Sequence, residues 1–298
     1  MRLNGVRDKT VSMSTVDADR MDLTGRKIAV VGGTNGLGRA IARLAASRGA
    51  KADVVGRTFR DDGSQGIGFV RADLTSMREA AEIGRTLPVE DADVLLFTTG
   101  IFAAKTREET AEHVERDMAV SYLSRHAMLR GLAARLGADR PADAPRPRVF
   151  VMAAPGTGTL GNPADLNADA ATYKALTAHM NTVAANEALV LAAPERLPGP
   201  AYFGLNPGMV RTDIRSNFLG DGSFLHRAAE SLIGVLGPTP EQYARRVLPL
   251  LFHPDLDGRD RVFFNPKAVP IQASPGMAGA RAAEFFDAGE DLLRRALA

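Results

Sequence analysis

The residues with the clearest chemical meaning are three glycines, Gly32, Gly36 and Gly38, spaced as Gly-xxx-Gly-x-Gly. They follow the apolar run 27–31 and precede a helical pattern that begins at Arg39. In a strand, glycine turn and helix of this kind, Gly32 permits the tight turn, Gly36 lets the backbone approach a pyrophosphate, and Gly38 lets helix and strand pack closely. The spacing predicts a dinucleotide site made of Gly32, Thr34, Asn35, Gly36, Leu37 and Gly38.

A second group of residues bears on which dinucleotide this motif would bind. The second apolar run ends Val54-Val55-Gly56-Arg57. Proteins that bind NAD usually present Asp or Glu at this place to the ribose hydroxyls, and no carboxylate stands there. The guanidinium of Arg57, with Arg60 nearby, is suited to pair with the 2′-phosphate of NADP, because it is planar and permanently charged. We therefore predict NADP as the cofactor, with NAD as the alternative.

These residues need a scaffold, and the hydrophobic pattern indicates one. Short apolar runs alternate with helix-length segments, which predicts a parallel sheet with crossover helices. Right-handed crossovers place helices on both faces, so the expected fold class is α/β, a doubly wound parallel sheet whose ligand crevice lies at the carboxyl ends of its strands. The predicted strands lie near 27–31, 52–55, 67–70, 93–98, 148–153, 201–205 and 262–264.

Two long helices are predicted between the later strands, at 111–136, where a break is allowed, and at 171–192. After Pro207 the pattern is irregular. A short amphipathic piece is expected at 224–236, a helix at 239–252 and a further helix at the C-terminus.

The chain has 298 residues, 45% of them hydrophobic and 24% charged, which is enough for one large core. No linker-like tract interrupts it, so we expect one domain at 23–298, preceded by a mobile N-terminal extension at 1–22 that is polar and without periodicity. The segment 213–240 is expected on the substrate side. Its apolar side chains would suit a hydrophobic ligand, and they are Phe218, Leu219, Phe224, Leu225, Leu232 and Ile233.

Composition excludes several classes of function. The formal net charge is +2, from 37 basic and 35 acidic residues, so a nucleic-acid partner is not indicated. The chain has no cysteine, which rules out disulfides and cysteine-based zinc sites, and no metal is expected. No apolar run reaches the roughly 18 residues of a membrane span, and no apolar leader precedes Met21, so a cytoplasmic location is predicted.

The order of motifs resembles the short-chain dehydrogenase/reductase family over nearly the whole predicted domain. The glycine motif matches the family's signature, Asp73-Leu74 matches its adenine-side acidic position, and Thr98-Thr99-Gly100 stands where the family has Asn-Ala-Gly. The stretch from Asn206 to Thr212 fits the family's Pro-Gly-x-Val-x-Thr turn. The resemblance implies that the cofactor is also held by Asp73, Leu74, Thr99, Gly100, Pro207, Gly208, Val210 and Thr212.

The resemblance implies a single Rossmann-fold domain and an oxidoreductase that interconverts a carbonyl and an alcohol of a small molecule. It also implies a homo-oligomer, a dimer or tetramer, that pairs through the two long helices. One residue argues against NADP within the family. Asn35 stands where many NADP-dependent relatives carry a basic residue in the glycine loop.

The family's proton chemistry depends on Asn, Ser, Tyr and Lys. A tyrosine with a pKa near 10 needs a nearby cation to exchange protons at neutral pH. By resemblance, Tyr173 takes the role of acid and Ser121 stands at the Asn position. The Ser position falls on Ala153 or Ala154, so Thr157, or else Thr159, is the expected substitute.

The lysine position, four residues after Tyr173, holds Thr177. Lys174 follows Tyr173 directly, about 100° round a helix, and would point elsewhere unless the segment is not yet helical. His179 is interpreted as a packing or surface residue. The missing serine and lysine leave two alternatives open: a non-redox enzyme, such as a dehydratase, cyclase or isomerase, and a nucleotide-binding sensor.

Overall fold

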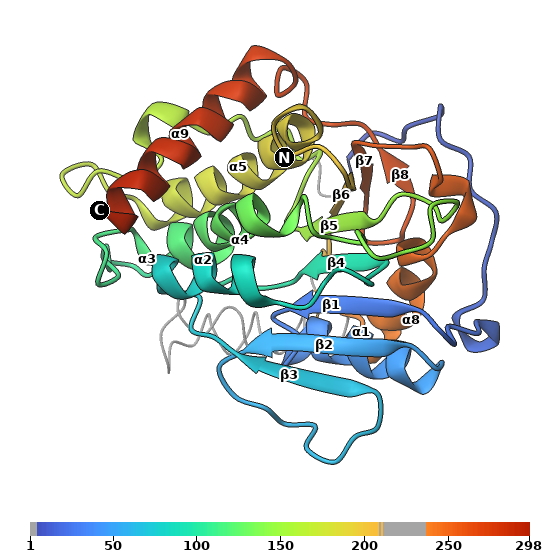
Figure 1. Ribbon diagram of the computed structural model, residues 1–298. Coiled ribbons are helices and arrows are strands. Elements are labelled where there is room, and N and C mark those ends of the chain that lie inside the picture. Colours follow the sequence, from blue (N-terminus) through green and yellow to red (C-terminus); the bar gives the residue numbers. More distant parts are fainter. Residues whose placement is uncertain (1–4, 209, 211–236) are drawn as a thin grey trace.

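The computed structural model describes residues 5–208, 210 and 237–298, and its centre is one eight-stranded sheet (Figure 1). The strands run in the order β3-β2-β1-β4-β5-β6-β7-β8, all neighbours parallel except β7 and β8, which are antiparallel. Their bounds are β1 Lys27–Val31, β2 Lys51–Gly56, β3 Ile67–Arg71, β4 Val94–Phe97, β5 Arg148–Met152, β6 Ala201–Leu205, β7 Val262–Phe264 and β8 Pro270–Ile271. The predicted doubly wound parallel sheet is confirmed.

Both faces of the sheet are buried, as the continuous apolar strands require. Along β1, Ile28 and Val30 join the core on one face, while Ala29 and Val31 join the core on the other. This alternation follows from the two-residue period of a strand. Chain order reverses between β1 and β4, so a crevice is expected at their carboxyl ends.

Helices cover the two faces (Figure 1). Helices α1 and α8 pack together on one face, and α2, α4, α5 and α9 cover the other. Their bounds are α1 Gly36–Ser47, α2 Met77–Thr86, α3 Arg116–Met118, α4 Ser124–Leu132, α5 Ala175–Arg196, α8 Pro240–Leu251 and α9 Ala280–Leu297. No helix of the described residues combines the length and apolarity needed to cross a membrane.

Both long helices begin later than the sequence suggested. The first begins at Arg116 and is interrupted by a π-helical turn, Ala119–Leu123, before α4. The second, α5, begins at Ala175. Before it, short acidic side chains form local turns: Asp165 accepts the N–H of Asp169 at 2.8 Å, and Asp169 accepts the N–H of Ala171 at 2.7 Å. Such bonds offer the backbone an alternative to helix.

Helix α9 changes what the long helices can contact. It packs along α5 and also touches α2 and α4, and every residue from 181 to 190 of α5 is buried. The surface that the resemblance assigned to contacts between copies is therefore occupied by the chain's own C-terminal helix. The homo-oligomer stays a prediction, and it would need either another surface or a displaced α9.

The described part of the N-terminal segment packs against the rest of the domain. Asp8 donates its N–H to the carbonyl of Pro270 at 2.9 Å, and Ser14 donates its N–H to Asp255 Oδ2 at 2.7 Å. Val11 is buried in the core beside α8. These contacts had no signal in the polar sequence of 1–22, and the mobility of this extension stays a prediction.

Candidate functional site

A cavity of about 1050 Å³ opens at the carboxyl ends of β1, β2 and β4, where the topology places a ligand crevice. It brings together predicted cofactor residues from four separate loops. Those that line it are Gly32, Thr34, Asn35, Gly36, Leu37, Gly38, Arg57, Asp73, Leu74, Thr99 and Gly100.

The glycine loop leaves backbone where side chains would otherwise fill the cavity. Gly32 has φ +87°, and a Cβ there would lie 2.7 Å from the Thr99 nitrogen. A Cβ on Gly38 would collide with the carbonyl oxygen of Gly32, so the predicted close packing is present. Asn35 does not cap α1 with its side chain, and the first N–H groups of this helix are therefore available to an anion. This cradle fits the pyrophosphate of a dinucleotide.

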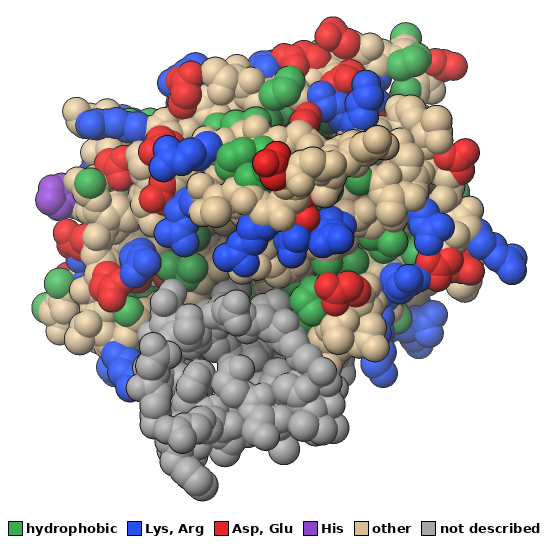
Figure 2. Space-filling view, turned by 90° about the horizontal axis from the view of Figure 1, so that it is seen from below, with side chains coloured by type: hydrophobic (Ala, Val, Ile, Leu, Met, Phe, Trp, Pro, Cys, Tyr) green, Lys and Arg blue, Asp and Glu red, His purple; other side chains and the backbone are tan. Residues whose placement is uncertain are grey.

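Arginines from several elements surround this cradle. Arg57 directly follows β2, where the sequence placed it, and its side chain is exposed. Four further arginines line the cavity with it: Arg39, Arg43, Arg116 and Arg245. The sequence did not single out these four, because they come from α1, α3 and α8 and only the fold gathers them. Figure 2 shows Lys and Arg side chains as a band across the visible face of the molecule.

Two carboxylates, Asp61 and Asp73, interact with arginines of this group. Asp61, which is buried, accepts two hydrogen bonds from Arg39, at 2.8 and 2.9 Å, and these bonds hold the pKa of Asp61 below its usual value. Burial raises the pKa of Asp73, but hydrogen bonds from Thr75 and the charges of Arg57 and Arg116 outweigh burial and lower it. The lowered pKa favours the ionised form of Asp73, and its predicted role on the adenine side stays a prediction.

The described residues of the turn after β6 are not among those that line the cavity. Gly208 has φ +65° and donates its N–H to Asn206 Oδ1 at 2.9 Å, which forms a tight turn. Pro207 lies within this turn, and Val210 is buried. The predicted contact Thr212 lies outside the described residues, as do 213–236 of the expected substrate segment with all six of its apolar side chains.

Arg125 supports the end of β4 from inside the protein. Its guanidinium donates to the carbonyl of Thr99 and, at 2.7 Å, to Asn186 Oδ1. The side chain is buried, and burial lowers the pKa of this group to about 9. Because Thr99 and Gly100 line the cavity, Arg125 shapes one of its walls.

We expect Arg125→Met to lower the free energy of unfolding by roughly 2–5 kcal/mol, because two buried acceptors lose a charged donor. Urea denaturation followed by circular dichroism measures this change. Arg130→Met is the matched control on the same helix, since the Arg130 side chain is 47% exposed and lies 3.6 Å from Glu290. The free energy of unfolding of Arg130→Met should fall by less than about 1 kcal/mol. Equal losses in the two variants would show that Arg125 does not support the β4 loop.

The predicted acid, Tyr173, precedes α5 rather than lying on it. Its hydroxyl donates to the carbonyl of Ala104 at 2.9 Å. Burial, together with the charges of Glu115 and Asp117, raises the pKa of Tyr173 to about 12. Lys174 also precedes the helix in extended conformation, with φ −136° and ψ 118°, so the helical angle does not apply to it. Lys174 is exposed while Tyr173 is partly buried, as expected for neighbours in an extended segment.

Ser121 lies in the π-helical turn and contacts both the cavity wall and a buried acid. Its Oγ accepts the N–H of Ile101, a residue that lines the cavity, at 3.1 Å, and donates to Asp117 Oδ1 at 2.5 Å. The other oxygen, Asp117 Oδ2, lies 2.8 Å from Nδ1 of His179. Asp117 was missed in the sequence, and its only signal is a spacing of four residues from Ser121.

The loop after β5 carries the predicted serine substitutes. Thr157 is buried and donates its hydroxyl to the carbonyl of Ala154 at 3.1 Å, and its Oγ1 lies 3.5 Å from Oγ1 of Thr159. Glu187 of α5 holds this loop by accepting the N–H of Gly156 at 3.1 Å. Burial raises the pKa of Glu187. Ser121, Thr157 and Tyr173 are not among the residues that line the cavity, and their catalytic roles stay predictions.

Comparison with known proteins supplies relatives for this chain. No family model matches the sequence. An uncharacterised oxidoreductase of Saccharomyces cerevisiae (strain ATCC 204508 / S288c) is 42% identical over 294 residues, which cover 98% of this chain and 95% of the yeast protein. A candidate daunorubicin C-13 ketoreductase, DnrU, of Streptomyces sp. (strain C5) is 28% identical over 228 residues, which cover 70% of this chain and 76% of that protein.

Solved structures share the fold. An uncharacterised protein from Mycobacterium paratuberculosis superposes with a TM-score of 0.68 at 19% identity, covering 94% of this chain and 98% of the other. A candidate short-chain dehydrogenase from Pseudomonas syringae gives a TM-score of 0.60 at 22% identity. The superposition covers 86% of this chain and 100% of the other. At these identities the likeness concerns the fold.

Proposed function

Because the chain belongs to the short-chain dehydrogenase/reductase family and is an oxidoreductase of that type, we propose that it interconverts a carbonyl and an alcohol of a small molecule with NADP(H) as cofactor. The observation that carries this proposal is the cavity that joins the glycine cradle to Arg57. The first turn of α1 would hold the pyrophosphate, and the Arg57 guanidinium would pair with the 2′-phosphate. When bound, the reduced cofactor supplies a hydride.

Two further observations support the proposal. The second strand ends at Gly56 and Arg57 follows it, so no carboxylate stands at the strand end where NAD-binding proteins usually carry one. The Streptomyces relative carries the name of a ketoreductase, and carbonyl reduction is the reaction that name describes. The substrate class proposed here is an aldehyde or ketone.

The test is a fluorescence titration of the purified protein with NADPH and NADH, followed by addition of aldehydes, ketones and quinones. We expect NADPH to bind about tenfold more tightly than NADH, a difference of about 1.4 kcal/mol. Cofactor oxidation should match alcohol formation one to one. Tight binding without turnover would favour the sensor alternative, and substrate conversion without cofactor oxidation would favour a non-redox enzyme.

A further inference from the structure

The pair formed by His179 and Asp117 joins two elements that are far apart in the chain. Nδ1 of the His179 ring lies 2.8 Å from Asp117 Oδ2, and 62 positions separate the two residues. The Asp117 side chain is completely buried, while that of His179 is 17% exposed. A carboxylate on Nδ1 fixes the tautomer and direction of an imidazole and leaves proton exchange to Nε2, on the opposite edge.

This pair reaches the edge of the dinucleotide cavity. Ser121 joins Asp117 to the N–H of Ile101, which lines the cavity, and Val120 beside Ser121 also lines it. Phe102, the residue after Ile101, stacks on the His179 ring with 4.0 Å between ring centres. The imidazole therefore lies one residue beyond the cavity wall, in the region that follows the end of β4.

The single proton of the Ser121 hydroxyl is already used. It is donated to Asp117, so this hydroxyl cannot also donate to a substrate. Ser121 and Asp117 are therefore suited to position another group, and His179 is the group that Asp117 contacts with its other oxygen. The π-helical turn Ala119–Leu123 places Ser121 for this contact, as such turns often do at functional sites.

The surroundings of Tyr173 oppose the role that the resemblance gave it. The Tyr173 hydroxyl is neutral before it donates its proton and becomes an anion afterwards. The negative charges of Glu115 and Asp117 disfavour that anion, so Tyr173 releases its proton less readily. The hydroxyl proton of Tyr173 is also occupied by the Ala104 carbonyl.

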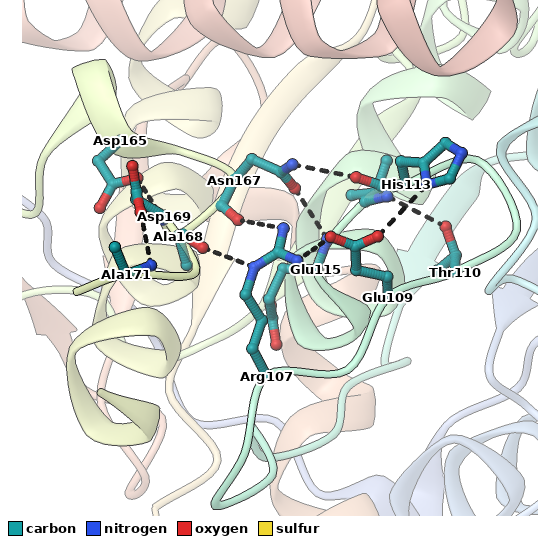
Figure 3. A network of polar contacts seen from close by, with 11 residues as sticks. Arg107, Glu109, Thr110, His113, Glu115, Asp165, Asn167, Ala168, Asp169 and Ala171 are labelled. Carbon is teal, nitrogen blue, oxygen red and sulfur yellow. Dashed lines mark hydrogen bonds and ion pairs between the residues drawn. The ribbon is translucent and has the colours of Figure 1, made fainter. Parts of the chain in front are cut away.

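A polar network connects the start of α3 to the loop before α5, close in sequence to the two partners (Figure 3). Arg107 donates from Nε to the carbonyl of Ala168 at 2.7 Å, and Asn167 Oδ1 accepts the N–H of Glu115 at 2.8 Å. Glu115 caps α3, which carries Asp117, by accepting the N–H of Met118 at 2.7 Å. The loop that contains Asn167 leads into α5, which carries His179. The network therefore connects the start of the helix that carries the acid to the loop before the helix that carries the imidazole.

We propose that His179 is the proton donor of carbonyl reduction in this protein, with Asp117 and Ser121 as positioning residues. The inference rests on the proposed function. The carbonyl carbon gains a hydride, and hence an electron pair, from the reduced nicotinamide, while the carbonyl oxygen takes the proton from Nε2 of His179. The products are the alcohol, the oxidised cofactor and a neutral imidazole, which takes up a proton from solvent again; the His179 side chain is 17% exposed.

The test compares His179→Ala, Asp117→Asn and Tyr173→Phe. We expect His179→Ala to lower kcat by roughly 100-fold to 1000-fold, Asp117→Asn by roughly tenfold to 100-fold, and Tyr173→Phe by less than about threefold. The NADPH affinity of all three should stay within about twofold of wild type by fluorescence, since none of these residues lines the cavity. Added imidazole should restore activity to His179→Ala alone.

A matched control uses another histidine that contacts a carboxylate. His113 lies 3.3 Å from Glu109, but its side chain is 87% exposed. His113→Asn should keep the wild-type kcat, and asparagine tolerates the φ of +59° at this position.

A readout independent of turnover is the nitrogen NMR spectrum of the imidazoles, which is tractable because the chain has five histidines. The neutral His179 ring should carry its proton on Nδ1 in the wild type, and Asp117→Asn should mix the two tautomers. Full activity in His179→Ala, or a Tyr173→Phe enzyme without activity, would overturn the role of His179 and leave the reductase intact. A wild-type protein that reduces no carbonyl would overturn the proposed function and, with it, this inference.

Discussion

Gly36→Asp is expected to weaken dinucleotide binding by roughly 100-fold or more, which corresponds to about 2.7 kcal/mol. Gly36 is the first residue of α1, has φ +51° and lines the cavity. A carboxylate at this place would face the pyrophosphate and cancel the favourable charge of the helix N-terminus. Fluorescence titration with NADPH measures the loss.

Two controls separate charge from backbone strain. Asparagine has nearly the same size as aspartate and the same tolerance of positive φ, but it carries no charge. Gly36→Asn should therefore lose much less NADPH affinity than Gly36→Asp. Gly63→Asp places the same carboxylate at another glycine of positive φ, +77°, with open space around it and no part in the cavity lining. This variant should bind NADPH as wild type does. Equal losses in Gly36→Asn and Gly36→Asp would mean that the charge at this helix end is irrelevant.

Arg57→Ala is expected to weaken NADPH binding by roughly tenfold to 100-fold, since a charge-assisted hydrogen bond contributes about 1.5–3 kcal/mol. NADH has no 2′-phosphate, so the affinity of this variant for NADH should fall by less than about twofold. The preference between the two cofactors would then disappear. Isothermal titration with each cofactor measures both constants in the same protein.

Arg71→Ala is the matched control for Arg57. Arg71 ends β3 and lies directly opposite Gly56 in the register of β2 and β3, but it does not line the cavity. Its removal takes one positive charge from the same end of the sheet. If Arg71→Ala lowered NADPH affinity as much as Arg57→Ala, a diffuse charge effect would replace the 2′-phosphate contact.

Local patterns predicted the scaffold well, because they depend on neighbouring residues alone. The strands β1, β6 and β7 have the predicted bounds, and the other predicted strands differ by one residue at one end or at both ends. The glycine loop was also readable, since the spacing of Gly32, Gly36 and Gly38 meets a requirement of the backbone. The start of α5 could not be predicted from the sequence, because acidic side chains in the preceding loop form turns that compete with helix.

The polar contacts between distant elements lay beyond such patterns. The resemblance gave the acid role to Tyr173, and His179, six residues further on and off the same helix face, was interpreted as a packing or surface residue. A single histidine on a helix carries no sign of its partner in the sequence. Tertiary structure brings Asp117 of α3 against His179 of α5 and gathers the arginines of α1, α3 and α8 round the cavity. It also lays α9 over the helices expected to pair between copies. Periodicity determines which face of an element is buried, whereas the packing of distant elements decides which polar side chains meet there.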